Sequence, residues 1–282
     1  MNIPASDPVQ LYDPVMALEF FKSAGEAEEI DKGEMIFGEN QKANRLLLQR
    51  DKMYLLLKGE VGIVAEKEKQ VVGIIKPGEI FGEMAPLTQS ARSASAMAKT
   101  VCRVIGLDDR QFLAGLEKKP EFALMLMSVM IRRLRDTIAR RRAAQALPGD
   151  ETGKESAVFD RKTLAALTRE LGNEPTVRYR RDSTILQEGG SGVQMYVVIE
   201  GRVAAYIQGS LVELIGPGGV FGEMTLVDQA PRVASAIADS DCALLAINRK
   251  TFLDLIKSNP AFGASLLRAL ADRLRFMTSG KK

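Results

Sequence analysis

The chain has 282 residues, a length that predicts two domains of ordinary size. Its 46% hydrophobic and 27% charged residues are typical of a soluble globular protein, and a net charge of +3 favours no particular partner. The absence of histidine and the presence of only two cysteines exclude a histidine-dependent nucleophile and argue against a transition-metal site.

The first half of the chain predicts an antiparallel β-fold followed by helices. Short apolar runs bounded by glycine, proline and charged residues are typical of strands, and they are clearest at residues 54–66, 70–80 and 100–108. A hairpin is expected around residues 66–70, and a surface insertion near residues 41–51. A helix follows from Asp109, and a long helix covers residues 121–142.

The long helix carries an apolar stripe with heptad spacing. Two readings stay open: the stripe packs on its own barrel, or it forms the seam of a homodimer. The stripe residues are Leu124, Met127, Ile131, Leu134 and Ile138. Six arginines, at 132, 133, 135, 140, 141 and 142, lie on the same helix. A solvated helix face is favoured over nucleic-acid binding, because no aromatic residues alternate with these arginines.

The second half of the chain repeats the first. Strand-like runs recur at residues 193–207, 211–220 and 242–248, and Cys242 lies 140 residues after Cys102, which predicts equivalent buried positions. A polar segment with Pro-Gly separates the copies. We predict a first domain at residues 1–142 with an N-terminal helix and a long C-terminal helix, a linker at 143–160, and a second domain at 161–282.

One segment is shared almost intact by the two copies. Residues 76–96 and 216–236 are identical at eleven of 21 positions, including Phe-Gly-Glu-Met and an arginine nine residues after the glutamate. A helix N-terminus offers backbone N–H groups to an anion, and a guanidinium matches phosphate oxygens. A carboxylate accepts hydrogen bonds from sugar hydroxyls. The segment therefore predicts a cradle for a ribose phosphate.

This repeated motif resembles the phosphate-binding cassette of the cyclic-nucleotide-binding domain. That domain is the sensor of the catabolite activator protein and of the regulatory subunit of cyclic-AMP-dependent protein kinase. The resemblance extends over residues 17–142 and 163–279. It implies a mainly β member of the α+β class: two antiparallel β-roll, jelly-roll-like barrels, each followed by C-terminal helices.

The resemblance also implies roles for individual residues. The cassette glutamates would accept the ribose 2′-hydroxyl, and the cassette arginines would pair with the cyclic phosphate. In the first copy the expected ligand-binding residues are Gly82, Glu83, Met84, Ala85, Arg92 and Ser93, with Val72 and Ile74 on the apolar wall and Thr137 in contact with the purine base. In the second copy they are Gly222, Glu223, Met224, Thr225, Arg232 and Val233, with Leu214 on the wall and Met277 or Thr278 at the base.

We predict a cytoplasmic receptor that binds cyclic AMP and passes a helix rearrangement to an unidentified protein partner, with no catalytic residues, metal or cofactor. Ser93 leaves cyclic GMP open as a ligand of the first copy, and a cyclic dinucleotide also stays open. A scaffold with relic cassettes and a DNA-contacting regulator are the alternatives. No apolar run reaches the ~18 residues that a membrane helix needs, and neither an appended winged helix nor a kinase-inhibitor segment is found.

Overall fold

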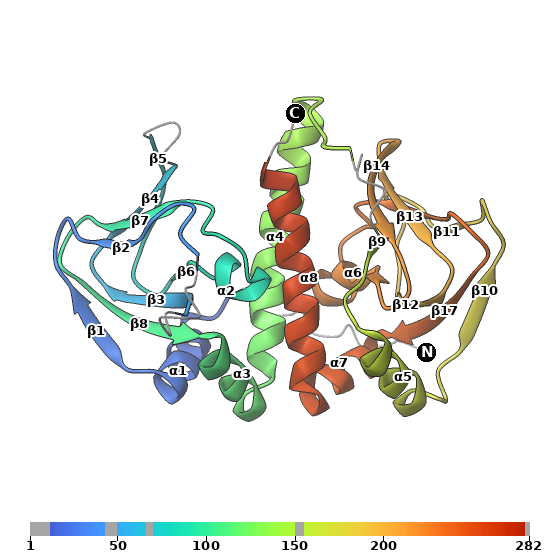
Figure 1. Ribbon diagram of the computed structural model, residues 1–282, viewed down its shortest axis with the longest axis horizontal. Helices are drawn as coiled ribbons and strands as arrows, with labels where there is room; N and C mark the ends of the chain where they lie inside the picture. Colours follow the sequence, from blue (N-terminus) through green and yellow to red (C-terminus); the bar gives the residue numbers. More distant parts are fainter. Residues whose placement is uncertain (1–11, 43–49, 66–69, 150–154, 280–282) are drawn as a thin grey trace, which may run out of the picture. The chain divides into compact units, whose positions relative to one another are not determined.

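The computed structural model describes residues 12–42, 50–65, 70–149 and 155–279 (Figure 1). The chain divides into two compact units, of which the first is Tyr12–Leu126 and the second contains the described residues from Met127 onward. The division lies inside the long helix and not at residue 142, where the sequence placed the end of the first domain. The part of that helix from Met127 onward therefore groups with the second copy.

The first unit is an antiparallel roll made of two sheets. Their strand orders are β1-β8-β3-β6 and β2-β7-β4-β5, and the described strands leave both sheets open. The strands are β1 (Ala27–Ile30), β2 (Met35–Phe37), β3 (Lys52–Lys58), β4 (Val61–Ala65), β5 (Gln70–Ile75), β6 (Ile80–Phe81), β7 (Ser95–Ala98) and β8 (Cys102–Asp108). Alternate side chains from both sheets, among them Leu56, Val61 and Val104, meet in a buried core.

Four helices accompany this roll: α1 (Pro14–Ala24), α2 (Met84–Thr88), α3 (Asp109–Lys118) and α4 (Glu121–Ala143). The start of α3 is fixed by a capping box, in which Asp108 and Gln111 each bind the other's backbone N–H. Helix α4 begins in an aromatic cluster, where Phe122 stacks on Phe20 with ring centres 3.7 Å apart. The first residues of α4, up to Leu126, are thus anchored in the first unit.

The second unit repeats this plan with sheets β10-β17-β12-β15 and β11-β16-β13-β14-β9. Its strands are β9 (Glu155–Ser156), β10 (Thr176–Tyr179), β11 (Thr184–Leu186), β12 (Gln194–Glu200), β13 (Val203–Ile207), β14 (Ser210–Ile215), β15 (Val220–Phe221), β16 (Ser235–Ala238) and β17 (Cys242–Asn248). Its helices are α5 (Arg161–Glu170), α6 (Glu223–Asp228), α7 (Arg249–Ser258) and α8 (Pro260–Ser279). Both cysteines are buried at equivalent strand positions, as the sequence predicted.

The predicted fold class is confirmed, and the predicted linker differs in one respect. Residues 155 and 156, which the sequence assigned to the linker, form β9 and pair in parallel with Leu214 and Ile215 of β14. A two-residue strand carries too little apolar periodicity to be seen in the sequence. The expected insertion at 41–51 and the turn at 66–70 fall largely outside the described residues, but β4 and β5 pair as the predicted hairpin.

The apolar stripe of α4 is covered within a single chain. Met127 and Ile131 are fully buried, and Leu134 and Ile138 are 2% and 3% exposed. Leu124, the first residue of the stripe, is half-buried. Most of the stripe therefore packs within one chain, and a homodimer through it stays a prediction. Among the described residues, no helix combines the length and the apolar character that crossing a membrane would require.

Candidate functional site

The second unit contains a cavity of about 290 Å³ beneath its cassette. This is close to the lower end of the ~300–1,000 Å³ usual for small-molecule sites. The roll provides apolar walls from Ala205, Ile207 and Ile215, and helix α8 contributes Ala269, Phe276 and Met277. The cassette residues Glu223 and Arg232 also line the cavity, so an acid and a cation meet apolar walls in one enclosure.

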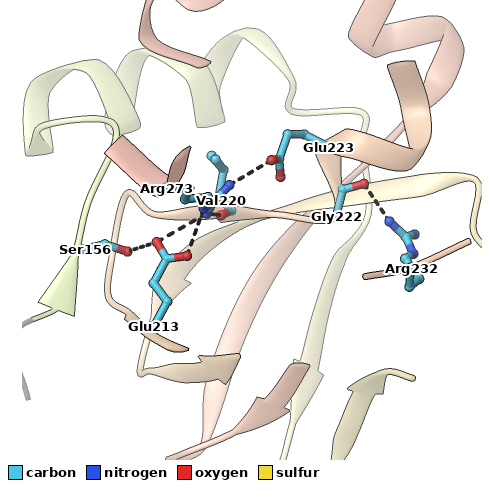
Figure 2. Close-up of polar contacts among 7 residues, drawn as sticks. All are labelled: Ser156, Glu213, Val220, Gly222, Glu223, Arg232 and Arg273. Carbon is cyan, nitrogen blue, oxygen red and sulfur yellow. Dashed lines mark hydrogen bonds and ion pairs between the residues drawn. The ribbon is translucent and has the colours of Figure 1, made fainter. Parts of the chain in front are cut away.

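The turn that opens the second cassette requires glycine. Gly222 has φ +84°, and a Cβ added there would lie 2.9 Å from Nη1 of Arg232. Nη1 of Arg232 donates to the Gly222 carbonyl oxygen at 2.5 Å (Figure 2), and Nη2 donates to that of Gln194 at 2.6 Å. Glycine both adopts the left-handed conformation and lets the guanidinium approach the backbone.

Arg232 is a buried cation that retains donor capacity. Its side chain is held by backbone carbonyl groups, and its Nε is buried without a hydrogen-bond partner among the described residues. Burial lowers the pKa of the Arg232 guanidinium, and the Glu223 carboxylate opposes this shift. Because arginine stays charged at neutral pH, the site offers a fixed positive charge to an anionic ligand.

A buried ion network fixes the cassette glutamate, as Figure 2 shows. Nη1 of Arg273, on α8, binds Oε1 of Glu223 at 2.7 Å, and Nε of Arg273 binds Oε2 of Glu213 at 2.8 Å. Ser156 donates to Oε1 of Glu213 at 2.6 Å. Burial alone would lower the pKa of Arg273, but the two carboxylates outweigh burial and raise it. Arg273 therefore orients the Glu223 side chain, whose Oε2 is an acceptor for a ligand hydroxyl.

The first cassette has the same turn but a different partner for its arginine. Gly82 has φ +72°, and Nη1 of Arg92 donates to its carbonyl oxygen at 2.6 Å. Nε of Arg92 lies 3.3 Å from Oδ1 of Asp51, and its guanidinium carbon lies 4.1 Å from the centre of the Phe37 ring. Burial lowers the pKa of Arg92, while Asp51 opposes the shift. Copy alignment places Val193 opposite Asp51, so the second cassette lacks this acid.

The serine of each Ala-Ser-Ala segment has a structural role. Ser95 Oγ accepts a hydrogen bond from the backbone N–H of Glu39 at 2.7 Å, and Ser235 Oγ accepts one from that of Glu188 at 2.9 Å. Each bond ties the strand after the cassette arginine to the loop that follows β2 or β11. The repeat in the sequence therefore reflects a shared loop anchor as well as a ligand motif.

The remaining cassette residues predicted from the sequence differ in their exposure. Met84 begins α2 and Ala85 is buried in it, whereas Met224 and Thr225 are buried in α6 and line the cavity. Glu83 is 3% exposed, Ser93 is exposed, and Val233 lines the cavity of the second unit.

The predicted wall residues are placed differently by a β-bulge. Ala205 pairs with Glu213 but Tyr206 pairs with Leu211, so Val212 is the extra residue of β14. Val212, Glu213 and Ile215 line the cavity, and Leu214 does not, because it points to the opposite face of the strand. Ile74, its counterpart in the first copy, is 43% exposed. The side chain of Val72 lies outside the described residues.

Thr137 belongs to the second unit, although the sequence predicted that it contacts the purine base in the first site. Its hydroxyl donates to the carbonyl oxygen of Arg133 at 2.8 Å, a bond within α4. Of the predicted base contacts in the second copy, Met277 lines the cavity, whereas Thr278 is exposed. Sequence reasoning missed Glu213, Arg273 and Ser156, and it also missed Leu134 and Ile138 of α4, which line the same cavity.

Comparison with known proteins places these observations in a family. The family model described as "Cyclic nucleotide-binding domain" matches residues 27–119 and 176–259. The cyclic AMP receptor protein of Thermus thermophilus is 38% identical over 102 residues, which are 34% of this chain and 47% of that protein. A cAMP-dependent protein kinase regulatory subunit of Colletotrichum orbiculare is 26% identical over 207 residues, 72% of this chain and 47% of the relative.

The chain thus spans about half the length of these curated relatives. Among solved structures, the catabolite activator protein of Thermus thermophilus is 34% identical, with 43% of this chain and 59% of that chain covered and a TM-score of 0.38.

Proposed function

Because the chain belongs to the cyclic nucleotide-binding domain family, we propose that it is a cyclic AMP receptor that binds ligand at both cassettes and signals to a partner protein. The observation that carries the proposal is the second cavity, where Glu223 and Arg232 line apolar walls large enough for a small ligand. A cyclic nucleotide has the matching chemistry: one phosphate charge, a ribose hydroxyl and an apolar purine face.

Each part of such a ligand has a counterpart in the cavity. The phosphate would lie against Arg232, whose charge is held in place by two backbone carbonyl groups. The 2′-hydroxyl would donate to Glu223, which the contact with Arg273 orients. The base would pack on the apolar side chains of the roll and of α8. In the first unit, Arg92 and Glu83 would play the corresponding roles.

The output we propose is a shift of helix α8 on binding. Arg273 links α8 directly to Glu223, and Phe276 and Met277 of α8 line the cavity. A ligand that binds one packing of α8 better than another shifts the equilibrium between them. Two of the relatives are named as a receptor protein and as a kinase regulatory subunit. A protein kinase subunit is therefore one class of partner to test.

The arginines of α4 favour this function over DNA binding. Arg135 and Arg142 form ion pairs within the second unit, with Asp228 and Glu188. Nε of Arg141 donates to the carbonyl oxygen of Met277 near the end of α8 at 3.1 Å. Arginines engaged in this way contribute little to a surface that binds the phosphates of DNA.

Calorimetric titration with cyclic AMP tests the proposal. The wild type should bind two equivalents, Arg92→Ala should lose one and Arg232→Ala the other. Each loss should amount to about 2–5 kcal/mol, because the phosphate is left without its cation. Arg178→Ala is the matched control, since that side chain is 74% exposed and should leave both sites intact.

Circular dichroism should show that the variants fold. A folded wild type that binds neither cyclic AMP nor cyclic GMP would instead favour a scaffold with relic cassettes. Full two-site binding by the double variant would overturn the assignment of the arginines.

A further inference from the structure

We infer that the C-terminal half of α4, which by sequence belongs to the first copy, forms part of the second ligand site and contributes to its affinity. It completes the apolar wall with two side chains and holds the cassette with two arginines. The inference rests on the proposed function, because it concerns the affinity of the same cavity. It assigns to the second site residues that lie nearly 90 positions before its cassette.

Arg135 holds both ends of the loop that leads to the cassette arginine. Its Nε and Nη2 bind Oδ2 and Oδ1 of Asp228 at 2.5 and 3.1 Å, and its Nη1 donates to the carbonyl oxygen of Pro231 at 2.8 Å. Asp228 is the last residue of α6, and Pro231 immediately precedes Arg232. A two-point guanidinium–carboxylate contact of this kind fixes geometry as well as charge.

Arg142 holds the other side of the cassette arginine. Its Nη2 donates to the carbonyl oxygen of Val233 and to Oε1 of Glu188, both at 2.6 Å. Oε2 of Glu188 in turn accepts the backbone N–H of Gln208 at 2.9 Å. The residues on both sides of Arg232 are therefore bound by α4, which limits the positions that its guanidinium can take.

Helix α4 also makes an apolar contact with the cavity itself. Leu134 and Ile138 line the cavity, and together with Arg142 they recur every fourth residue, a spacing that puts them on one face of the helix. Asp136 and Ala139, on the other side of α4, are exposed. The part of the ligand that α4 would cover is an apolar one, so we assign Leu134 and Ile138 to the face of the base.

Single substitutions in the full-length chain test this assignment. Arg92→Ala serves as the parent, so that cyclic AMP titrations report the second site alone. Adding Ile138→Ala should weaken binding by about 10–100-fold, from the apolar contact that is lost. Adding Arg142→Ala should weaken it by about 10-fold or more, because the cassette backbone is released.

Matched controls on the same helix are Arg132→Ala, which makes the same charge change at an exposed position, and Asp136→Ala. Both should leave the affinity within about 2-fold of the parent, as expected for exposed side chains. If Ile138→Ala and Arg142→Ala also bind like the parent, the inference is wrong although the proposed function stands. If the parent and the wild type bind no cyclic nucleotide, it is the proposed function that fails.

Hydrogen exchange on the parent supplies a readout that does not depend on the folding of any α4 variant. Cyclic AMP should slow amide exchange in peptides from residues 134–143 of α4, as well as in peptides from the second cassette. Protection of the cassette without any protection of α4 would overturn the inference.

Discussion

Replacing Arg273 by methionine should destabilise the second unit severely. The substitution keeps most of the side-chain volume but removes the cation that joins α8 to Glu213 and Glu223. It also removes the donor to the carbonyl oxygen of Val220, at 2.5 Å. The cost follows from how well each abandoned group can be rehydrated.

The three abandoned groups differ in exposure, and so in cost. The Glu213 side chain is 21% exposed and can regain water, so its share is small. The Glu223 side chain is 2% exposed and cannot, and a buried charge left without its partner costs about 3–5 kcal/mol. The Val220 carbonyl adds about 1 kcal/mol. A total of roughly 4–6 kcal/mol is a large part of the ~5–15 kcal/mol that stabilises a typical domain.

Hydrogen exchange at increasing urea is the suitable assay, because the chain has no tryptophan and its two units need separate transitions. Peptides from β12 to β17 should lose protection at much lower urea in Arg273→Met, whereas peptides from β3 to β8 should not change. The control is Lys250→Ala, which removes an ion pair whose lysine is 88% exposed and should cost no more than about 0.5 kcal/mol.

A rescue variant tests the physical reason. Adding Glu223→Gln to Arg273→Met removes the buried charge and should recover about half of the loss or more. A loss below about 1 kcal/mol in the single variant, or no recovery in the double variant, would refute the view that an uncompensated Glu223 charge dominates the cost.

Two further outcomes follow from the cassette. Gly222→Ala should weaken second-site binding and lower the free energy of unfolding by about 1–3 kcal/mol, because it strains a φ of +84° and places a methyl group against Arg232. The control, Gly209→Ala, has a φ of +79° and open space around it, so it should cost only the backbone strain and leave binding unchanged. Calorimetry measures the binding and thermal unfolding measures the stability. Val233→Ser should bring cyclic GMP affinity at the second site closer to that of the first, where Ser93 has a hydroxyl, and equal affinities in the wild type would contradict this.

The sequence revealed what two copies share, and it could not reveal what only one copy has. The strands, the helices and the cassette turn appeared twice, so repetition supported each of them. The Glu213–Arg273–Glu223 network includes one acid that the first copy lacks, because Gly73 occupies the position of Glu213 there. Its members are separated by 10 and 50 residues, and no local pattern marks such a network.

Two other differences arise from geometry that periodicity does not capture. One extra residue in β14 places Val212 and Glu213 on the same wall of the cavity and leaves Leu214 on the opposite face of the strand. The sequence did not predict this, because a bulge has no reliable signature in an apolar run. The spacing of the α4 stripe correctly indicated a buried face, but a heptad pattern does not say what covers it. The structure gives Leu134 and Ile138 to the second cavity.

The division of the chain inside α4 has a consequence for how such a protein can evolve. The boundary of the repeat in the sequence and the boundary of the compact unit differ by most of helix α4. The first copy can then not be deleted or exchanged at its sequence boundary without removing Leu134 and Ile138 from the wall of the second copy's pocket. Substitutions on the C-terminal part of α4 are therefore constrained by the second pocket as well as by the copy that encodes them.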